Sequence, residues 1–155
     1  MPGIYIDAQV DRAMVAGLTI IGDLAASGVL RHYVVVGLGT NGPVTAEQIR
    51  ELRREIGPGR NLILVNTFGP MPWESEVNGV LGAARHDARV GLADWHRAIE
   101  NRSDLLWPDG IHPQPSGAKV YARVVHAAVQ AELSRPQAPA CPQPESTPTG
   151  KARGN

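Results

Sequence analysis

The sequence YVVVGLGTNG at residues 33–42 decides the fold class. Residues 33–38 are a continuous apolar run rich in β-branched side chains, which is typical of a strand covered on both faces of a parallel sheet. The run ends in a turn of glycine, threonine and asparagine. Further along the chain, NLILVN at residues 61–66 predicts a second buried strand, and RVGLA at residues 89–93 predicts a short third one.

Helical patterns separate these strands. Thr45 and Gln48 form a capping box, and Asp94 and Ser116 are expected to be the N-caps of two further helices. The expected helices cover residues 11–26, 45–56, 74–86, 94–99 and 116–134, and a short strand is expected at residues 4–7. Strands and helices that alternate in this way predict right-handed βαβ crossovers. We therefore expect an α/β protein with three layers, in which helices cover both faces of the sheet.

Length, charge and cysteine content narrow the functional classes. The chain has 155 residues, of which 43% are apolar, and this suits a single globular domain. Fifteen basic and fifteen acidic side chains cancel, so nucleic acid is not expected as a partner. The single cysteine, Cys141, excludes a disulfide within the chain and a metal site built on several thiolates. We expect neither a metal ion nor an organic cofactor.

The expected domain covers residues 1–134. From residue 135 the composition changes to Pro, Gln, Ser, Thr and Gly, which predicts a disordered tail over residues 135–155. Residues 1–7 lack the basic start and apolar run of a secretion signal. No apolar run approaches the roughly 20 residues that span a bilayer. The sequence by itself therefore leaves the localisation open.

The turn LLWPDGIHP at residues 105–113 carries the first candidate for chemistry. A carboxylate at Asp109 that accepts the Nδ1 proton of His112 would fix the tautomer of the imidazole, which could then act as a general base. The simpler interpretation is that Asp109 caps a turn and His112 packs beside Trp107. The position of this turn, after the third strand and before the last helix, favours the catalytic interpretation.

Gly39 and Asn41 lie in the second candidate, the turn that directly follows the strand at residues 33–38. Ligands of parallel sheets bind at the carboxyl ends of the strands. The side-chain amide of Asn41, held on a glycine-flanked turn, can donate a hydrogen bond to a developing oxyanion. Because Asn-Gly also favours turns for conformational reasons alone, Asn41 gains weight only beside Asp109 and His112.

Together these residues resemble two sequence blocks of the SGNH (GDSL-type) hydrolase family. Residues 39–42 are similar to its Gly-x-Asn-Asp block, with Gly42 in place of the aspartate, and residues 109–112 are similar to its Asp-x-x-His block. The surrounding sequence most resembles the SGNH domains of bacterial membrane acyltransferases that O-acylate cell-envelope glycans. The similarity extends over roughly residues 3–130.

The resemblance implies a flavodoxin-like parallel sheet and acyl chemistry on carbohydrate. It implies that His112 is the base, that Asp109 orients it, and that Asn41 and Gly39 contribute to the oxyanion site. The implied substrate is an acylated carbohydrate or a small ester. A membrane acyltransferase domain of the parent protein is an implied partner, which would place the chain outside the cytoplasm.

The family's nucleophile block, Gly-Asp-Ser after the first strand, has no counterpart here. None of the serines lies on a strand-to-helix elbow; they are Ser27, Ser75, Ser103, Ser116, Ser134 and Ser146. In the family's strand order the first strand is central, so residues 4–7 would be the second strand without its neighbour. We therefore expect a sheet that lacks its first, central strand and a site that lacks its nucleophile.

Three functional interpretations remain open. The chain is part of an O-acyltransferase or esterase domain and is inactive alone, or it is a non-catalytic relative that binds glycan or pairs with a chain that supplies the missing strand. The third is a nucleotide-binding domain. It is weakened because residues 37–42, although they have the Gly-x-Gly-x-x-Gly spacing, contain no lysine.

Overall fold

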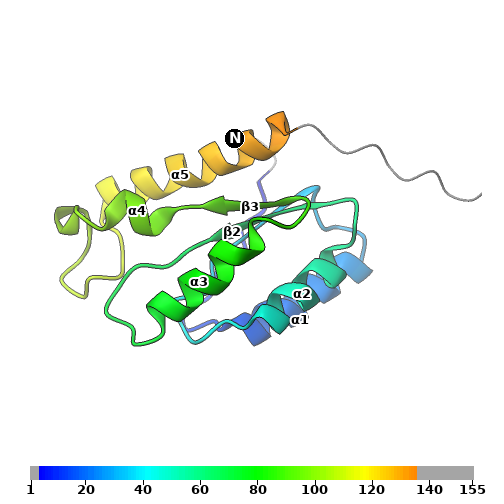
Figure 1. The fold of residues 1–155 in the computed structure, drawn as a ribbon, viewed down its shortest axis with the longest axis horizontal. Helices are drawn as coiled ribbons and strands as arrows, with labels where there is room; N and C mark the ends of the chain where they lie inside the picture. Colours follow the sequence, from blue (N-terminus) through cyan, green and yellow to red (C-terminus); the bar gives the residue numbers. More distant parts are fainter. Residues whose placement is uncertain (1–3, 136–155) are drawn as a thin grey trace, which may run out of the picture.

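The computed structural model describes residues 4–135 and contains a sheet of three parallel strands (Figure 1). The strands are β1 (Tyr33–Val36), β2 (Asn61–Val65) and β3 (Val90–Ala93), in the order β1-β2-β3. The three apolar runs predicted as strands are therefore confirmed, although β1 ends two residues earlier than the run. Of the tail predicted over residues 135–155, residues 136–155 lie outside the described residues.

Helices cover both faces of the sheet, so the predicted α/β/α architecture is confirmed (Figure 1). One face packs against α1 (Met14–Ala26), α2 (Ala46–Ile56) and α3 (Glu74–Ala84). The other face packs against α4 (Trp95–Ile99), a 3₁₀ turn (Ser103–Leu105) and α5 (Pro115–Ser134). Each face thus has its own apolar core.

The two outer layers bury the central strand but not the whole sheet. All five residues of β2 are buried, as expected for a strand with neighbours on both edges and helices on both faces. In β1, by contrast, Val34 and Val36 are buried while Val35 keeps 44% of its surface exposed. The β1 side of the sheet is therefore open.

Local signals placed most helix starts correctly. Thr45 and Gln48 form the predicted capping box of α2, and the Asp94 side chain accepts the Arg97 N–H at the start of α4. The prediction of Ser116 as an N-cap is wrong, because α5 begins at Pro115 with Gln114 as its N-cap. Proline is favoured in the first helical turn, because the backbone N–H groups there have no partner within the helix and the absence of one costs no hydrogen bond. Helix α1 begins at Met14 rather than at residue 11.

The predicted strand at residues 4–7 is wrong. This segment has no regular secondary structure and no strand pairing, and Ile4, Tyr5 and Ile6 are 58%, 63% and 79% exposed. A β-prone sequence becomes a strand only when a neighbouring edge accepts its hydrogen bonds. Within residues 4–135 no edge pairs with this segment.

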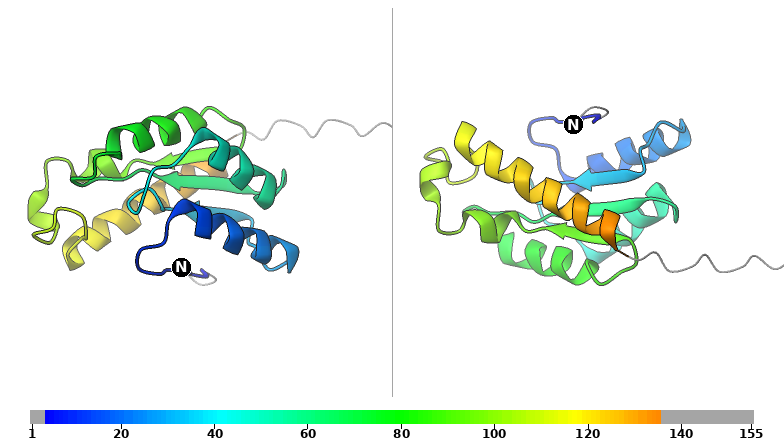
Figure 2. Two further views of the ribbon diagram at one scale, coloured as in Figure 1. Left: turned by 90° about the horizontal axis from the view of Figure 1, so that it is seen from below. Right: turned by 90° about the horizontal axis from the view of Figure 1, so that it is seen from above.

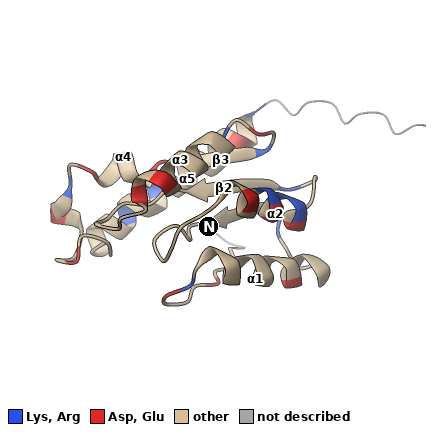
Figure 3. Ribbon diagram, turned by 60° about the horizontal axis from the view of Figure 1, so that its bottom comes forward, with Lys and Arg blue, Asp and Glu red and all other residues tan. Residues whose placement is uncertain are grey.

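Charged side chains are most concentrated on α2, where basic and acidic groups alternate (Figure 3). Glu47 pairs there with Arg50 at 2.6 Å and with Arg54 at 3.4 Å. This cluster therefore neutralises much of its own charge. Within the described residues, the helices are too short or too polar to cross a membrane.

Candidate functional site

The turn at residues 105–113 is closed by backbone hydrogen bonds that fix its shape. The Trp107 N–H donates to the His112 carbonyl at 2.8 Å, and the Gly110 N–H donates to the Trp107 carbonyl at 2.9 Å. Gly110 has a φ of 70°, a left-handed conformation that glycine adopts without strain. The Gln114 side chain donates to the Leu106 carbonyl at 2.7 Å and ties the turn to the start of α5.

Asp109 both caps this turn and holds His112. Its Oδ1 accepts the backbone N–H groups of Ile111 at 2.8 Å and His112 at 2.9 Å, while its Oδ2 lies 2.9 Å from Nδ1 of His112. The geometry therefore fits both interpretations of this pair, the one in which Asp109 caps the turn and the one in which Asp109 orients His112. The His112 side chain remains 74% exposed, so its other ring nitrogen is free to meet a reactant.

These contacts lower the pKa of Asp109 from 3.8 to about 2, chiefly through the backbone N–H groups of Ile111 and His112 and secondarily through the His112 imidazole. The carboxylate is therefore ionised at any pH at which an imidazole could act as a base. An ionised Asp109 keeps a proton on Nδ1 of His112 and leaves Nε2 as the acceptor.

We predict that His112→Ala leaves most of this lowered pKa in place. Alanine removes the imidazole but keeps both backbone donors, which are the larger causes. A ¹³C NMR titration of the Asp109 carboxyl group should therefore give a pKa still clearly below 3.8. A return to the ordinary value would mean that the imidazole, not the turn, stabilises the carboxylate.

The Gly39–Asn41 turn is held from two sides at the carboxyl ends of β1 and β2. The Trp73 Nε1–H donates to the Gly39 carbonyl at 3.2 Å, and the Thr40 and Thr67 hydroxyl oxygens are 3.0 Å apart. A β-carbon at Gly39 would lie 2.7 Å from Val77, so only glycine fits there without movement. The Asn41 amide donates to the Arg12 carbonyl at 3.4 Å, a long and exposed contact.

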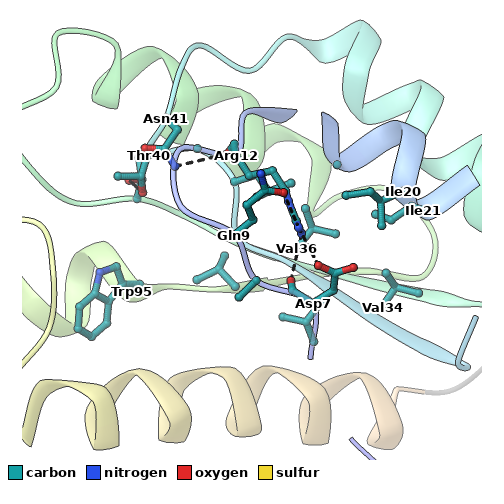
Figure 4. A pocket seen from close by; sticks show the side chains of 18 of the residues that line it. Asp7, Gln9, Arg12, Ile20, Ile21, Val34, Val36, Thr40, Asn41 and Trp95 are labelled. Carbon is teal, nitrogen blue, oxygen red and sulfur yellow. Dashed lines mark hydrogen bonds and ion pairs between the residues drawn. The ribbon is translucent and has the colours of Figure 1, made fainter. Parts of the chain in front are cut away.

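Both candidate clusters line one groove of about 790 Å³ beside β1 (Figure 4). Gly39, Asn41 and His112 all contribute to its wall, and Asp109 lies behind His112, outside the lining. Figure 4 shows Asn41 and Thr40 at one end of the groove and Val34 and Val36 of β1 along it. Asn41 and His112, which are 71 positions apart in the sequence, thus lie at one rim.

Sequence reasoning did not identify three groups at this site. The Trp73 indole positions Gly39 through its hydrogen bond to the Gly39 carbonyl, and no local pattern marks this role. Thr67 follows the carboxyl end of β2. Because ligands of parallel sheets bind at the carboxyl ends of the strands, the position of Thr67 in the sequence could have identified it as a site residue. Arg12 lines the groove from the loop before α1, and no local pattern marks it. Trp107, beside the turn, is 52% exposed.

Within the part of the chain that the structure describes, no serine lines the groove. The hydroxyl groups that do line it belong to Tyr5, Tyr33, Thr40, Thr67 and Tyr121. Ser116 lies in the first turn of α5, and Ser75 lies in the first turn of α3. Residues 4–135 also contain no cluster of three or more His, Cys, Asp or Glu side chains that could hold a metal ion.

Relatives of this chain are bacterial O-acetyltransferases. It is 30% identical over 125 residues to the peptidoglycan O-acetyltransferase OatA of Listeria monocytogenes, a match that covers 81% of this chain and 20% of that protein. YrhL of Bacillus subtilis, described as a candidate peptidoglycan O-acetyltransferase, is 33% identical over 128 residues, covering 82% and 20%. The chain thus spans about a fifth of the length of these curated relatives.

Solved structures share the fold. The C-terminal catalytic domain of Streptococcus pneumoniae OatA, solved with a methylsulfonyl adduct, matches with a TM-score of 0.76 and 22% identity over 88% of this chain and 84% of that one. A lipolytic G-D-S-L family protein from Veillonella parvula matches with a TM-score of 0.64 and 13% identity over 77% and 75%. No family model matches the chain.

Proposed function

Because the chain belongs to the SGNH (GDSL-type) hydrolase family and is related to bacterial peptidoglycan O-acetyltransferases, we propose that it provides the base and the oxyanion site for transfer or hydrolysis of O-acyl groups on carbohydrate. One observation carries the proposal. Asp109 holds Nδ1 of His112 at 2.9 Å, and the imidazole lines the same groove as Gly39 and Asn41.

His112 acts in this proposal as the base and then as the acid. A hydroxyl nucleophile transfers its proton to Nε2 of His112 while its oxygen bonds to the acyl carbon. Nε2 returns the proton to the sugar oxygen as the bond between that oxygen and the acyl carbon breaks. Water or an acceptor hydroxyl then releases the acyl group by the same steps. Asp109 stabilises the imidazolium that forms each time.

Asn41 and Gly39 stabilise the negative charge on the tetrahedral intermediate. The Asn41 amide can exchange its long contact with the Arg12 carbonyl for a stronger bond to an oxyanion. The backbone N–H of Gly39 is the second donor, and Trp73 keeps this turn in place by binding the Gly39 carbonyl. Loss of one donor of this kind typically costs ~10²–10³ in rate.

The nucleophile is the part that residues 4–135 do not offer, because no serine lines the groove. A triad remnant without its nucleophile retains at most about 10³–10⁴-fold acceleration over water. We therefore propose that this chain by itself is close to inactive. Thr40 and Thr67 are the hydroxyls that could contradict this, because both lie on the rim.

The test uses an O-acetylated oligomer of N-acetylglucosamine as both ligand and substrate. We expect the amide signals of Gly39, Asn41 and His112 to shift on titration in NMR. We also expect acetate release by the wild-type chain to stay within about twofold of that by His112→Ala, because a base without a nucleophile cannot form the acyl intermediate.

Each arm has an outcome that contradicts the proposal. Unchanged signals at the groove would overturn the proposed substrate class. A loss of acetate release of about tenfold or more in His112→Ala would mean that the described residues contain their own nucleophile. Thr40→Val and Thr67→Val would then show which hydroxyl it is.

The substrate and the location follow from the relatives and stay part of the proposal. The relatives are named for O-acetylation of peptidoglycan, a glycan that lies outside the cytoplasm. We propose that this chain meets its glycan there, beside the membrane acyltransferase region of a parent protein. The balanced charge, with fifteen basic and fifteen acidic side chains, suits a glycan better than a nucleic acid.

The alternative is a module that binds glycan without turning it over. Trp107, 52% exposed beside Asp109, favours it, because an exposed indole can stack on a sugar ring. Signal shifts at Trp107 without any acetate release would support this function. Shifts confined to the groove rim would support the acyl-transfer site.

A further inference from the structure

A basic residue precedes each strand of the sheet. Arg31 lies two residues before β1, Arg60 lies directly before β2, and Arg89 lies directly before β3. Because parallel strands all begin at the same side of a sheet, these arginines gather at the side opposite to the rim that carries Asn41 and His112. We call this side of the molecule the amino edge.

The helices end at the amino edge and add further arginines. Figure 2 shows α1, α2 and α5 ending at one end of the molecule, opposite the turn at residues 105–113. Arg53 and Arg54 lie in the last turn of α2, and Arg85 follows α3 as its C-cap. Basic side chains are favoured at helix C-termini, which accounts for these three arginines but not for those in the loops before the strands.

Arginines without an acidic partner are concentrated at the amino edge. Within residues 4–135, those that form no ion pair there are Arg31, Arg53, Arg60, Arg85 and Arg89. The carboxylates at this end, Asp23, Glu55 and Asp87, are therefore not paired with them. Figure 3 shows basic positions along α2 and around the loop that enters β3, at the end of the molecule away from α4.

Backbone carbonyl groups, not carboxylates, hold two of these guanidinium groups in place. Arg60 donates to the carbonyls of Ile56 at 2.8 Å and Leu30 at 3.3 Å, and Arg53 donates to the Arg60 carbonyl at 3.2 Å. A carbonyl oxygen accepts a hydrogen bond without cancelling the charge of its donor. The amino edge thus presents positive charge in fixed positions.

Arg89 brings another positive charge close to Arg53. Burial and then the charge of Arg89 lower the pKa of Arg53, and Asp87 offsets part of this effect. Arg89 itself has a φ of 61°, a left-handed conformation that is uncommon for a residue other than glycine. Like charges held together in this way, at a position where a neutral glycine would fit more easily, indicate a surface that binds anions.

Two exposed apolar side chains at this edge favour a lipid surface over a soluble anion. Val29, 60% exposed, comes shortly before Arg31, and Leu133, 53% exposed, lies in the last turn of α5. Arg135 donates to the Val90 carbonyl at 3.4 Å, which places the end of α5 at the amino edge. Exposed aliphatic side chains beside basic ones are typical of surfaces that lie in the membrane interface.

We propose that the amino edge docks on a membrane surface that contains anionic phospholipids. The arginines contact the lipid phosphates, while Val29 and Leu133 enter the headgroup region. The balanced total charge does not oppose docking, because charges farther than about 8–10 Å from the phosphates are screened at physiological ionic strength. Local charge at the amino edge, not net charge, decides the interaction.

The consequence for the candidate site rests on the proposed function. The strands begin at the amino edge and end at the rim that carries Asn41 and His112, so the whole length of the sheet separates the two. A chain that docks through its amino edge therefore turns the rim away from the lipid. The groove would then face the glycan that lies above the membrane.

Flotation with lipid vesicles tests the docking. We expect the full chain to float with phosphatidylcholine vesicles that contain about one-third phosphatidylglycerol, and to be released by sodium chloride at about 0.5 M. Vesicles of phosphatidylcholine alone should leave it in solution. No flotation with the anionic vesicles, or equal flotation with the neutral ones, would overturn the proposal.

Two triple variants of equal net charge test whether the amino edge is the surface involved. One variant combines Arg31→Gln, Arg85→Gln and Arg89→Asn, since asparagine tolerates the left-handed conformation at residue 89. The control variant removes three exposed basic side chains on α4 and α5, by Arg97→Gln, Lys119→Gln and Arg123→Gln.

At roughly fivefold in affinity for each basic group near the lipid, the amino-edge variant should bind anionic vesicles about 100-fold more weakly than the wild type. The control variant should stay within about threefold of the wild type, because its substitutions lie away from the lipid. Equal weakening by both variants would show that net charge governs binding and would overturn docking through the amino edge. Far-UV circular dichroism confirms that each variant is folded.

NMR in bicelles tests the orientation in the wild-type chain and does not depend on any variant. A spin-labelled lipid should broaden the amide signals of Arg31, Arg60 and Arg89 and leave those of Asn41 and His112 sharp. The opposite pattern would overturn the proposal. Displacement from vesicles by a single-stranded oligonucleotide, at a phosphate concentration below that of the lipid, would assign the surface to nucleic acid and overturn it as well.

Failure of docking and failure of the proposed function give different results. If the chain does not float while the O-acetylated oligomer still shifts the signals of Gly39, Asn41 and His112, docking is overturned and the proposed function keeps its support. If the chain floats while those signals stay unchanged on addition of the oligomer, docking holds and the proposed substrate class is overturned.

Discussion

Replacing Gly117 with alanine should destabilise the fold and loosen the turn that carries Asp109 and His112. A β-carbon at Gly117 would overlap the backbone carbonyl oxygen of Leu105 and lie 3.1 Å from Cβ of Pro113. Because a backbone atom cannot rotate out of the way, the start of α5 must move from the turn. Overpacking of this kind costs about 1–3 kcal/mol, which urea unfolding should detect as a lower midpoint with an unchanged slope.

Gly79→Ala is the matched control, since it places the same methyl group in α3. Nothing lies within 4 Å of a β-carbon at Gly79. Alanine in a helix interior is favoured over glycine by about 0.5–1 kcal/mol, so this variant should be slightly more stable than the wild type. If both variants unfold at the same urea concentration, α5 does not lie as close to the turn as described here.

The same substitution should also disturb the candidate site. A hydrogen bond of 2.8 Å from the Gln114 N–H to the Leu105 carbonyl joins the turn to α5. A displaced helix would lengthen that bond and weaken the contact between Asp109 and His112. The NMR signals of the His112 ring should then broaden or shift in Gly117→Ala and stay unchanged in Gly79→Ala.

Ile63→Ala should strongly destabilise the sheet. Ile63 is completely buried in β2, in the core beneath α5. Replacement of a buried isoleucine by alanine typically costs about 2–5 kcal/mol, because transfer energy is lost and a cavity remains. Urea or thermal unfolding measures the loss directly.

Val35→Ala provides the comparison, because Val35 pairs opposite Ile63 but lies on the open edge. With 44% of its surface exposed, Val35 should lose less than about 1 kcal/mol. A cost at Val35 equal to that at Ile63 would mean that the β1 edge is covered in the isolated chain, contrary to the groove described above.

Local sequence patterns were sufficient to predict the elements whose hydrogen bonds join residues a few positions apart. The capping box of Thr45 and Gln48 and the cap at Asp94 involve residues three positions apart, so the sequence contains the whole interaction. The turn of Asp109 and His112 is equally local, and its hydrogen bonds are those expected of a capped turn. The prediction of Ser116 as an N-cap was wrong because Pro115, one residue earlier, has the stronger preference for the first helical turn.

The sequence by itself determined the strand cores, the α/β class and the two clusters of polar residues, because burial and turn formation depend on neighbours within a few positions. The missing first strand was expected from the family resemblance, whereas only the tertiary structure decided that residues 4–7 do not form a strand and that Asn41 and His112 line one groove. Strand pairing and the meeting of distant loops depend on which edges and layers are present around a segment, and no local pattern contains that information.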